Sequence, residues 1–351
     1  MNSNPLSNKK VGVIGAGSFG TVFANLLAQN RSVVLYARRT EEAERLERER
    51  TYKTWRLHDQ VEITSDPEYL AGACELIFPV VPAQAFPGML QTFSPYLKPY
   101  HRLLHATKGL HVVLNEGEEL SQLKKLRKEQ VLTMSELIKQ ETTVLRVGCV
   151  AGPNLASEIA EGQPAATVVA SPFDEVIREG QQALRSTNFR VHGAHDIIGI
   201  ELAGVLKNIM AIAAGILDGL GLGENTKAML ITRGLAEMVN IAKPLGGEVN
   251  AFLGLAGIGD LIATCSSPAS RNYTVGYRVA KGESTQEVIK SMDEVAEGVR
   301  TIAIVRALAQ THKFSAPISL ALYKILFDEY DIQKGIRLLM EFPYREDGEL
   351  V

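Results

Sequence analysis

The 351-residue sequence is poor in features that would point to several classes of protein. It contains only three cysteines, Cys74, Cys149 and Cys265, and their wide separation fits neither a disulfide framework nor a metal site. The formal net charge is only −3, so no basic surplus favours nucleic acid or an anionic membrane as a partner. These features indicate a globular protein of a reducing compartment, without a metal and without a nucleic-acid partner.

Long apolar stretches are also missing. The polar start MNSNPLSNKK is followed by VGVIGAG, which is too short and too rich in glycine for the apolar core of a signal peptide. No window has the run of about 18 uninterrupted apolar residues that a membrane-spanning helix requires. We therefore expect no membrane span and a cytoplasmic location.

The chain changes character near residue 197. Before it, short β-branched runs such as KVGVIGA, SVVLYA, CELIFPVV, HRLLHAT, VLRVGCVAG and AATVVAS alternate with helical patterns, which predicts a doubly wound, mostly parallel sheet. After it, apolar residues recur at helical spacing without a convincing strand. The expected fold is α/β, with a Rossmann-like domain over 9–197 and an all-α domain over 198–345. The strongly charged stretch 115–130 is expected to be an exposed helix or a mobile, solvated excursion.

A glycine-rich turn follows the first predicted strand. Gly15, Gly17 and Gly20 form a G-x-G-x-x-G pattern between a predicted strand and a predicted helix. Gly15 permits the tight turn, Gly17 lets the backbone approach a pyrophosphate, and Gly20 allows close packing of helix on strand. The free amides at the start of the helix then face the phosphates. The sequence therefore predicts a dinucleotide site.

The end of the second predicted strand bears on which dinucleotide is bound. A site that prefers NAD usually has an acidic residue here, but this sequence has Arg38 and Arg39. A guanidinium cannot accept a hydrogen bond from the ribose 2′-hydroxyl, but it can pair with a 2′-phosphate. We therefore expect NADP or NAD as cofactor, with NADP preferred. The alternative is that both arginines are solvated loop residues.

The segment GVLKNIMAIAAG places an ammonium group in an apolar helix. At 3.6 residues per turn, Gly204, Lys207, Asn208, Ala211 and Gly215 fall on one face, which lacks bulky side chains. Either another helix packs closely on this face, or a ligand that is not protein reaches it.

Polar residues also follow two predicted strands. Lys108 comes after HRLLHAT, at the edge where ligands of an open α/β sheet bind. Gly152 and Asn154 follow VLRVGCVAG, and Asn154 is either an N-cap or a ligand-binding residue.

A third group of polar residues follows the glycines of GLAGIG. Asp260 and Thr264 lie one helical turn apart and can share a face. Ser267 and Pro268 are expected to be the N-cap and the first residue of a helix. That helix would carry, near its positive end where an arginine suits a phosphate ester, Ser270, Arg271 and Asn272.

Together these segments resemble one known family. GAGSFGT, ATKGL, AGPNLASEIA, ELAGVLKNIMAIAAG and GLAGIGDLIATCSSPASRNYTVG, in this order, are similar to NAD(P)-dependent glycerol-3-phosphate dehydrogenases of the bacterial biosynthetic type. The likeness runs from about residue 9 to about residue 330. It implies that the chain interconverts dihydroxyacetone phosphate and sn-glycerol 3-phosphate for phospholipid synthesis. It also implies a homodimer, and an active site in the cleft between two domains.

The resemblance further assigns residues by motif. Lys207 would be the catalytic acid/base, which requires its pKa to fall below the model value of about 10.4. The substrate would be bound by Lys108, Gly152, Asn154, Lys207, Asp260, Ser270, Arg271 and Asn272. The cofactor would be contacted by Gly15, Gly17, Ser18, Phe19, Gly20, Arg38, Arg39, Lys108, Ala156, Arg271, Val295 and Glu297. The chain departs from the family at Asn154, where serine or threonine is usual, and the charged stretch 115–130 is longer than the family norm.

Two other interpretations remain open. Hydroxyacid and hydroxyacyl-thioester dehydrogenases also join a Rossmann domain to a helical one and can use a lysine–asparagine pair, but they have less need for Arg271. A non-catalytic dinucleotide-binding regulator would have no reason to keep Lys207, Asn208 and Asp260 together. Turnover of dihydroxyacetone phosphate would support the glycerol-3-phosphate dehydrogenase. Turnover of an oxoacid or acyl thioester only would support the second interpretation, and nucleotide binding without turnover would support the regulator.

Overall fold

The computed structural model describes residues 9–115, 117–120, 123–292, 296–312 and 314–342. The chain folds into two compact units, of which the first comprises Met1–Thr107 and Met134–Ile197 and the second comprises Lys108–Thr133 and Ile198–Val351. The sequence prediction placed the whole of 9–197 in one domain. In the structure, residues 108–133 belong to the second unit instead.

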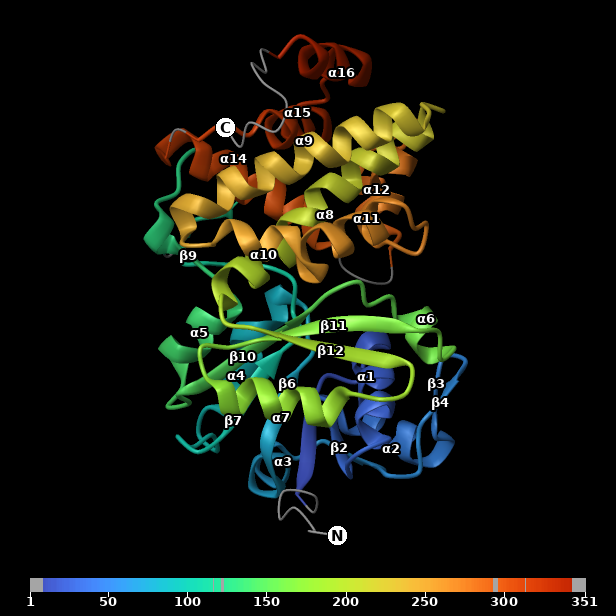
Figure 1. The fold of residues 1–351 in the computed structure, drawn as a ribbon, viewed down its shortest axis with the longest axis vertical. Helices are drawn as coiled ribbons and strands as arrows, with labels where there is room; N and C mark the ends of the chain where they lie inside the picture. The colour runs from blue at the N-terminus through green and yellow to red at the C-terminus, as the bar shows by residue number, and fades with distance from the viewer. Residues whose placement is uncertain (1–8, 116, 121–122, 293–295, 313, 343–351) are drawn as a thin grey trace. The chain divides into compact units, whose positions relative to one another are not determined.

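The first unit is built on an eight-stranded sheet of order β12-β11-β10-β7-β6-β1-β2-β5 (Figure 1). Every neighbouring pair is parallel except β10 and β11, which confirms the prediction of a mostly parallel sheet. The strands are β1 (Lys10–Ile14), β2 (Val33–Tyr36), β5 (Val61–Thr64), β6 (Cys74–Pro79), β7 (Arg102–His105), β10 (Arg146–Ala151), β11 (Ala165–Ala170) and β12 (Phe189–Ala194). A separate two-stranded hairpin joins β3 (Thr51–Tyr52) and β4 (Trp55–Arg56).

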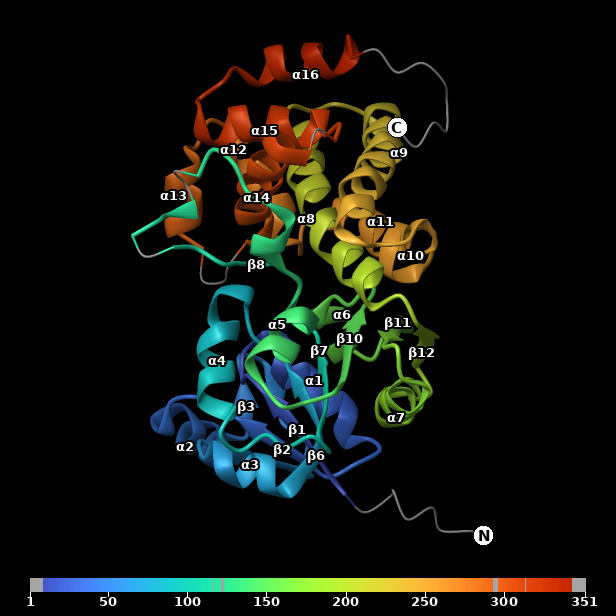
Figure 2. The same cartoon turned by 90° about the vertical axis from the view of Figure 1, so that its left-hand side faces the viewer.

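Helices cover both faces of this sheet. Figure 2 shows α4 on one side of the strands and α7 on the other. On the side of α7 lie α1 (Ser18–Ala28), α6 (Ala156–Ala160) and α7 (Asp174–Leu184); on the side of α4 lie α3 (Pro67–Ala73), α4 (Phe86–Phe93) and α5 (Met134–Glu141). Helix α2 (Thr40–Glu49) packs against β5. The central strands β1 and β2 are buried almost throughout, which is why they appear in the sequence as continuous β-branched runs.

The two edge strands were not predicted. β5, with the sequence VEIT, and β12, with the sequence FRVHGA, are partly exposed along their length. Edge strands with one exposed face lose the continuous apolar run of a buried strand, so their composition resembles that of a loop.

The second unit is helical and is centred on α8 (Ile197–Gly219), which Figure 2 shows between α14 and α9. Its other elements are β8 (His111–Val112), β9 (Val131–Leu132), α9 (Glu224–Ala242), α10 (Val249–Leu253), α11 (Asp260–Cys265), α12 (Arg271–Ala280), α13 (Thr285–Lys290), α14 (Glu297–His312), α15 (Pro317–Phe327) and α16 (Ile332–Met340). By length and composition α8 could cross a bilayer, with a mean hydropathy of 1.8. However, 94% of that window is buried inside the protein, as in the core helix of a globular fold.

Part of the small-residue face of α8 exists because another helix packs on it. A Cβ at Gly215 would lie 2.0 Å from the carbonyl oxygen of Tyr273 in α12. In return, a Cβ at Gly276 would lie 1.9 Å from the carbonyl oxygen of Ile212 in α8. The two helices therefore meet backbone against backbone. The sequence left open whether a helix or a ligand lies on this face. At the Gly215 end it is a helix.

The described residues of the charged stretch 115–130 include the short 3₁₀ turn Lys128–Gln130 but no α-helix. Leu126 is 1% exposed, and its amide donates to the carbonyl oxygen of Ala307 at 3.1 Å. Arg306 donates to the carbonyl oxygen of Leu123 at 3.1 Å. Most of the described residues of this stretch are exposed, as expected of a solvated segment, but they do not form an exposed α-helix. The segment is also not free of the fold, because Leu126 is buried and its amide bonds to α14.

Replacing Gly215 tests the backbone contact between α8 and α12. Gly215→Ala should lower the free energy of unfolding by at least about 2 kcal/mol, because a backbone atom cannot move away like a side chain. The matched control is Gly88→Ala in α4, where no described atom lies within 4 Å of the new Cβ. That change should raise stability by about 0.5–1 kcal/mol. Urea unfolding measures the free energy of unfolding of both variants. Equal values for the two variants would contradict the packing argument.

Candidate active site

The glycine turn between β1 and α1 has the geometry of a phosphate cradle. Gly15 has φ +118°, and a Cβ at Gly20 would lie 1.8 Å from the Gly15 carbonyl oxygen, so the fold itself requires both glycines. At Gly17 a Cβ would meet no described atom within 4 Å. Gly17 is the N-cap of α1, and the first turn has neither a capping side chain nor an acidic residue. The open approach at Gly17 and the uncompensated helix terminus fit a pyrophosphate.

Arg38 and Arg39 lie together after β2. Arg39 is the N-cap residue of α2, both arginines are exposed, and neither guanidinium forms a hydrogen bond or ion pair within the described part of the chain. The first turn of α2 carries Glu41 and Glu42, so the positive end of the helix is already partly compensated. The two exposed guanidinium groups can still bind a phosphate group next to the end of β2.

In the second unit, the structure brings Lys207, Lys108 and Asp260 together. Lys207 Nζ donates to Asp260 Oδ1 at 2.5 Å, and Lys108 Nζ donates to Asp260 Oδ2 at 2.7 Å. Lys207 also donates to the hydroxyl of Thr264. Asp260 is 1% exposed and Lys207 is 5% exposed. One buried carboxylate thus holds two ammonium groups, one on each oxygen.

This environment lowers the pKa of Lys207 to about 8. The main cause is burial, which disfavours the charged amine, and the nearby ammonium of Lys108 acts in the same direction. Asp260 opposes the shift but does not outweigh the loss of hydration. The buried geometry therefore lowers the pKa of Lys207, as the acid/base role requires.

The turn before Asp260 explains how the carboxylate reaches this position. Residues Leu255–Gly259 form one π-helical turn between α10 and α11. A Cβ at Gly257 would lie 2.2 Å from the carbonyl oxygen of Phe252, so only glycine fits. Such turns are rare and often occur at functional sites. The turn sets Asp260 at the start of α11, and Thr264 follows it on the same face, as predicted from the spacing.

Helix α12 begins later than the sequence suggested. Its N-cap is Ser270, whose hydroxyl accepts from the amide of Tyr273 at 3.3 Å. The prediction that Ser267 and Pro268 start the helix was wrong, because the Ser267 hydroxyl closes a local turn with the amide of Ala269 instead. Even so, Ser270, Arg271 and Asn272 lie at the positive end of α12.

Asn272 already has a partner within the protein. Its Oδ1 accepts from the amide of Gly298, in the first turn of α14, at 2.9 Å. Asn272 thereby joins the start of α12 to the start of α14. Its Nδ2 is the atom through which it would contact a ligand. Glu297 is the first residue of α14, and Val295 lies outside the described residues.

At the end of β10, the structure differs from the prediction that Asn154 could be an N-cap. The N-cap of α6 is Leu155, and Asn154 instead donates from Nδ2 to Thr167 Oγ1 at 2.9 Å. The N-cap interpretation of Asn154 was therefore wrong. Ala156 is the first residue of α6, and Gly152 has φ +152°.

The predicted residues thus divide between the units. The first unit holds Gly15, Gly17, Ser18, Phe19, Gly20, Arg38, Arg39, Gly152, Asn154 and Ala156. The second holds Lys108, Lys207, Asp260, Ser270, Arg271, Asn272 and Glu297.

Two residues belong to the site without having been assigned to it. Thr264 contacts Lys207, and spacing alone had placed it one turn from Asp260. Asn208 is 5% exposed, and within the described chain its side-chain amide has no hydrogen-bond partner. Its position next to Lys207 on the small-residue face was the signal for including it.

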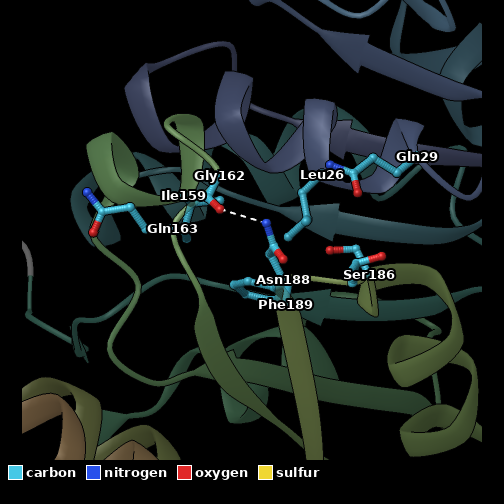
Figure 3. A pocket seen from close by; sticks show the side chains of 9 residues that line it. Leu26, Gln29, Ile159, Gly162, Gln163, Ser186, Asn188 and Phe189 are labelled. Carbon is cyan, nitrogen blue, oxygen red and sulfur yellow. Dashed lines mark hydrogen bonds between the residues drawn. The ribbon is translucent and has the colours of Figure 1, made fainter.

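A pocket elsewhere in the first unit is not part of these clusters. Figure 3 shows it between the end of α1 and the loops before β11 and β12, where Asn188 donates to the carbonyl oxygen of Gly162 at 2.9 Å. None of the predicted site residues lines it. Within the described residues, no group of three or more histidine, cysteine, aspartate or glutamate side chains is placed to hold a metal ion.

Comparison with known proteins gives a consistent result along the chain. Residues 10–176 match the family model for the N-terminus of NAD-dependent glycerol-3-phosphate dehydrogenase, and residues 196–337 match the model for its C-terminus. The glycerol-3-phosphate dehydrogenase [NAD(P)+] of Pseudomonas aeruginosa strain LESB58 is 41% identical over 346 residues, covering 97% of each chain. That of Pseudomonas putida KT2440 is 42% identical over 346 residues, covering 97% of this chain and 96% of its own. The crystal structure of glycerol-3-phosphate dehydrogenase from Coxiella burnetii has a TM-score of 0.84 at 31% identity, covering 95% of this chain and 99% of that one.

Gly17→Ala separates ligand binding from folding. The protein has room for the methyl group, so thermal stability should remain that of the wild type. Affinity for NADPH should fall by at least about tenfold, because the methyl group occupies the approach to the pyrophosphate. Fluorescence titration with NADPH measures the effect. Wild-type affinity in Gly17→Ala would show that the pyrophosphate does not bind at this turn.

Proposed function

Because this chain belongs to the NAD-dependent glycerol-3-phosphate dehydrogenase family, we propose that it reduces dihydroxyacetone phosphate to sn-glycerol 3-phosphate and catalyses the reverse oxidation. The observation that carries this proposal is the buried Lys207, whose pKa of about 8 lets it release and accept a proton near neutral pH. The hydroxyacid dehydrogenase alternative does not account for a family match over both halves of the chain.

Lys207 acts on the oxygen at C2 of the substrate. The bound nicotinamide cofactor supplies or takes up the hydride at C2. In reduction, the Lys207 ammonium donates a proton to the C2 oxygen as the carbonyl becomes a hydroxyl. In oxidation, neutral Lys207 accepts the hydroxyl proton. Asp260 and Thr264 hold the amine in place for both directions.

The charge around the site favours a phosphate ester as substrate. With both lysines protonated, Lys108, Lys207 and Asp260 together carry a net charge of +1. Arg271 adds a second cation at the N-terminal end of α12, where the helix terminus also favours an anion. We assign Arg271, with Ser270, to the phosphate group.

We infer that NADPH is preferred to NADH. Arg38 and Arg39 are adjacent, exposed and unpaired within the described chain, at the end of β2 where a ribose 2′-phosphate lies in this type of fold. The 2′-hydroxyl of NADH would need a hydrogen-bond acceptor such as a carboxylate, and the two arginines cannot accept a hydrogen bond.

We also propose that the protein is a cytoplasmic homodimer that supplies glycerol 3-phosphate for phospholipid synthesis. Its three cysteines are buried and none of them forms a disulfide, as is usual in a reducing compartment. Light scattering in solution tests the dimer, and a monomer at micromolar concentration would contradict it.

Lys207→Ala tests the acid/base assignment. It should lower kcat in both directions by at least about 100-fold while NADPH affinity stays unchanged, because the proton donor is lost but the cofactor turn is untouched. Lys243→Ala, at an exposed site after α9, is the matched control and should keep wild-type activity. Near-normal turnover by Lys207→Ala would refute the role of Lys207.

The cofactor preference is tested with dihydroxyacetone phosphate and either NADPH or NADH. The wild type should consume NADPH much faster at low cofactor concentration. Replacing Arg38 and Arg39 together by alanine should raise KM for NADPH by about 10- to 100-fold and leave KM for NADH nearly unchanged. Arg48→Ala, at the other end of α2, is the control. Equal use of both cofactors by the wild type would show that these arginines do not contact a 2′-phosphate.

A further inference from the structure

Asp218, Lys227 and Tyr273 join three helices of the second unit in one cluster. Tyr273 Oη donates to Asp218 Oδ2 at 2.5 Å, and Lys227 Nζ lies 3.0 Å from Asp218 Oδ1. Asp218 is at the end of α8, Lys227 is in α9 and Tyr273 is in α12. Lys227 and Tyr273 are both buried. The carboxylate of Asp218 therefore binds a hydroxyl through one oxygen and an ammonium group through the other.

The two charges of this cluster lie at the unfavourable ends of their helices. Asp218 is next to the last residue of α8, where the helix terminus repels an anion, and Lys227 is near the start of α9, where the terminus repels a cation. Each charge therefore depends on the other for compensation. An ion pair that only added stability gains nothing from this placement, which indicates that the carboxylate also serves its other partner, Tyr273.

Tyr273 is held at three points. Its amide donates to the N-cap hydroxyl of Ser270 at 3.3 Å, its carbonyl oxygen packs on Gly215, and its hydroxyl reaches Asp218. The glycine contact sets how closely α12 approaches α8, but it has no direction. The hydrogen bond is directional, so it fixes the rotation of α12 and its position along α8. Burial raises the pKa of Tyr273 to about 12, and the hydrogen bond to Asp218 acts in the same direction, so the hydroxyl keeps its proton at neutral pH.

The helices that Tyr273 and Asp218 join also carry the candidate active site. Ser270 is the N-cap of α12 and Arg271 is its first residue, so both lie in the turn that Tyr273 fixes. Lys207 and Asp218 are about three helical turns apart on α8 and share one face of that helix. The hydrogen bond between Tyr273 and Asp218 therefore ties the start of α12 to the helix that carries the proposed acid/base.

We propose that Tyr273 and Asp218 are positioning residues that hold Arg271 in place relative to Lys207, so that the phosphate group is bound while the C2 oxygen meets the amine. Lys227 keeps the Asp218 carboxylate in position for the tyrosine hydroxyl. This inference rests on the proposed function, in which Arg271 binds the phosphate group. It adds the contact that sets where that guanidinium lies.

Tyr273→Phe tests the positioning role, because it removes the hydroxyl and keeps the ring. The side chain of Asp218 is 22% exposed, so water can replace the hydroxyl and the variant should fold. KM for dihydroxyacetone phosphate should rise by about threefold to tenfold, while kcat stays within about twofold and NADPH affinity is unchanged. The matched control is Tyr277→Phe in the same helix, whose hydroxyl has no hydrogen-bond partner within the described residues and which should keep the wild-type KM. An unchanged KM in Tyr273→Phe would overturn the inference, and so would a loss of kcat and NADPH affinity without a rise in KM.

A double-mutant cycle tests whether Tyr273 acts through Arg271. In an Arg271→Ala background, Tyr273→Phe should cause no further rise in KM for dihydroxyacetone phosphate, because no guanidinium is left to position. An equal rise in both backgrounds would overturn the positioning role and leave the proposed function standing. A wild-type protein that does not reduce dihydroxyacetone phosphate would overturn the proposed function, and this inference with it.

Discussion

The carboxylate of Asp260 is the interaction on which the candidate active site depends. It is buried and accepts from two ammonium groups, at 2.5 Å from Lys207 and 2.7 Å from Lys108. Burying an unpaired lysine would drive its pKa far down, whereas an exposed ion pair would hold it up. The balance reached here leaves Lys207 able to exist in both protonation states near neutral pH. Removing Asp260 would leave the buried Lys207 and the partly buried Lys108 without the carboxylate between them, so the main role of Asp260 is electrostatic.

Close backbone packing makes this arrangement rigid. α8 and α12 touch through Gly215 and Gly276, and Gly298 brings the start of α14 within reach of Asn272. A Cβ at Gly298 would lie 2.7 Å from the carbonyl oxygen of Asn208. Two helices therefore approach the backbone of α8 closely. α12 does so at Gly215, and α14 does so through Gly298 at Asn208.

The sequence predicted the central sheet and the glycine turn because each depends on local chemistry. A buried parallel strand needs a continuous apolar run, and a phosphate cradle needs glycines at fixed spacing. Helical periodicity also predicted the helix that carries Lys207. The same periodicity predicted that Asp260 and Thr264 share one helical face. The family resemblance then supplied residue roles that periodicity could not.

The errors arise where a hydrogen bond or contact other than the expected local one is formed. Ser267 has the signature of an N-cap, but Ser270 caps α12 instead. Asn154 also looks like a cap, yet Thr167, which lies on another strand, takes its amide. Leu126 sits in a charged run that appears solvated, but it is buried against α14. For Asn154 and Leu126 the deciding partner is distant in sequence, so no local pattern reports it, whereas at Ser267 two local hydrogen-bond patterns compete.

The most direct test of this account is the pH dependence of kcat/KM in both directions with the wild-type enzyme. Reduction requires the Lys207 ammonium, so its kcat/KM should be constant at lower pH and fall as pH rises through about 8. Oxidation requires the neutral amine, so its kcat/KM should rise through the same pH and then level off. Profiles that cross near the same pH with opposite slopes would support a buried lysine as the acid/base. An inflection near the ordinary lysine value of about 10.4, or none at all, would contradict it.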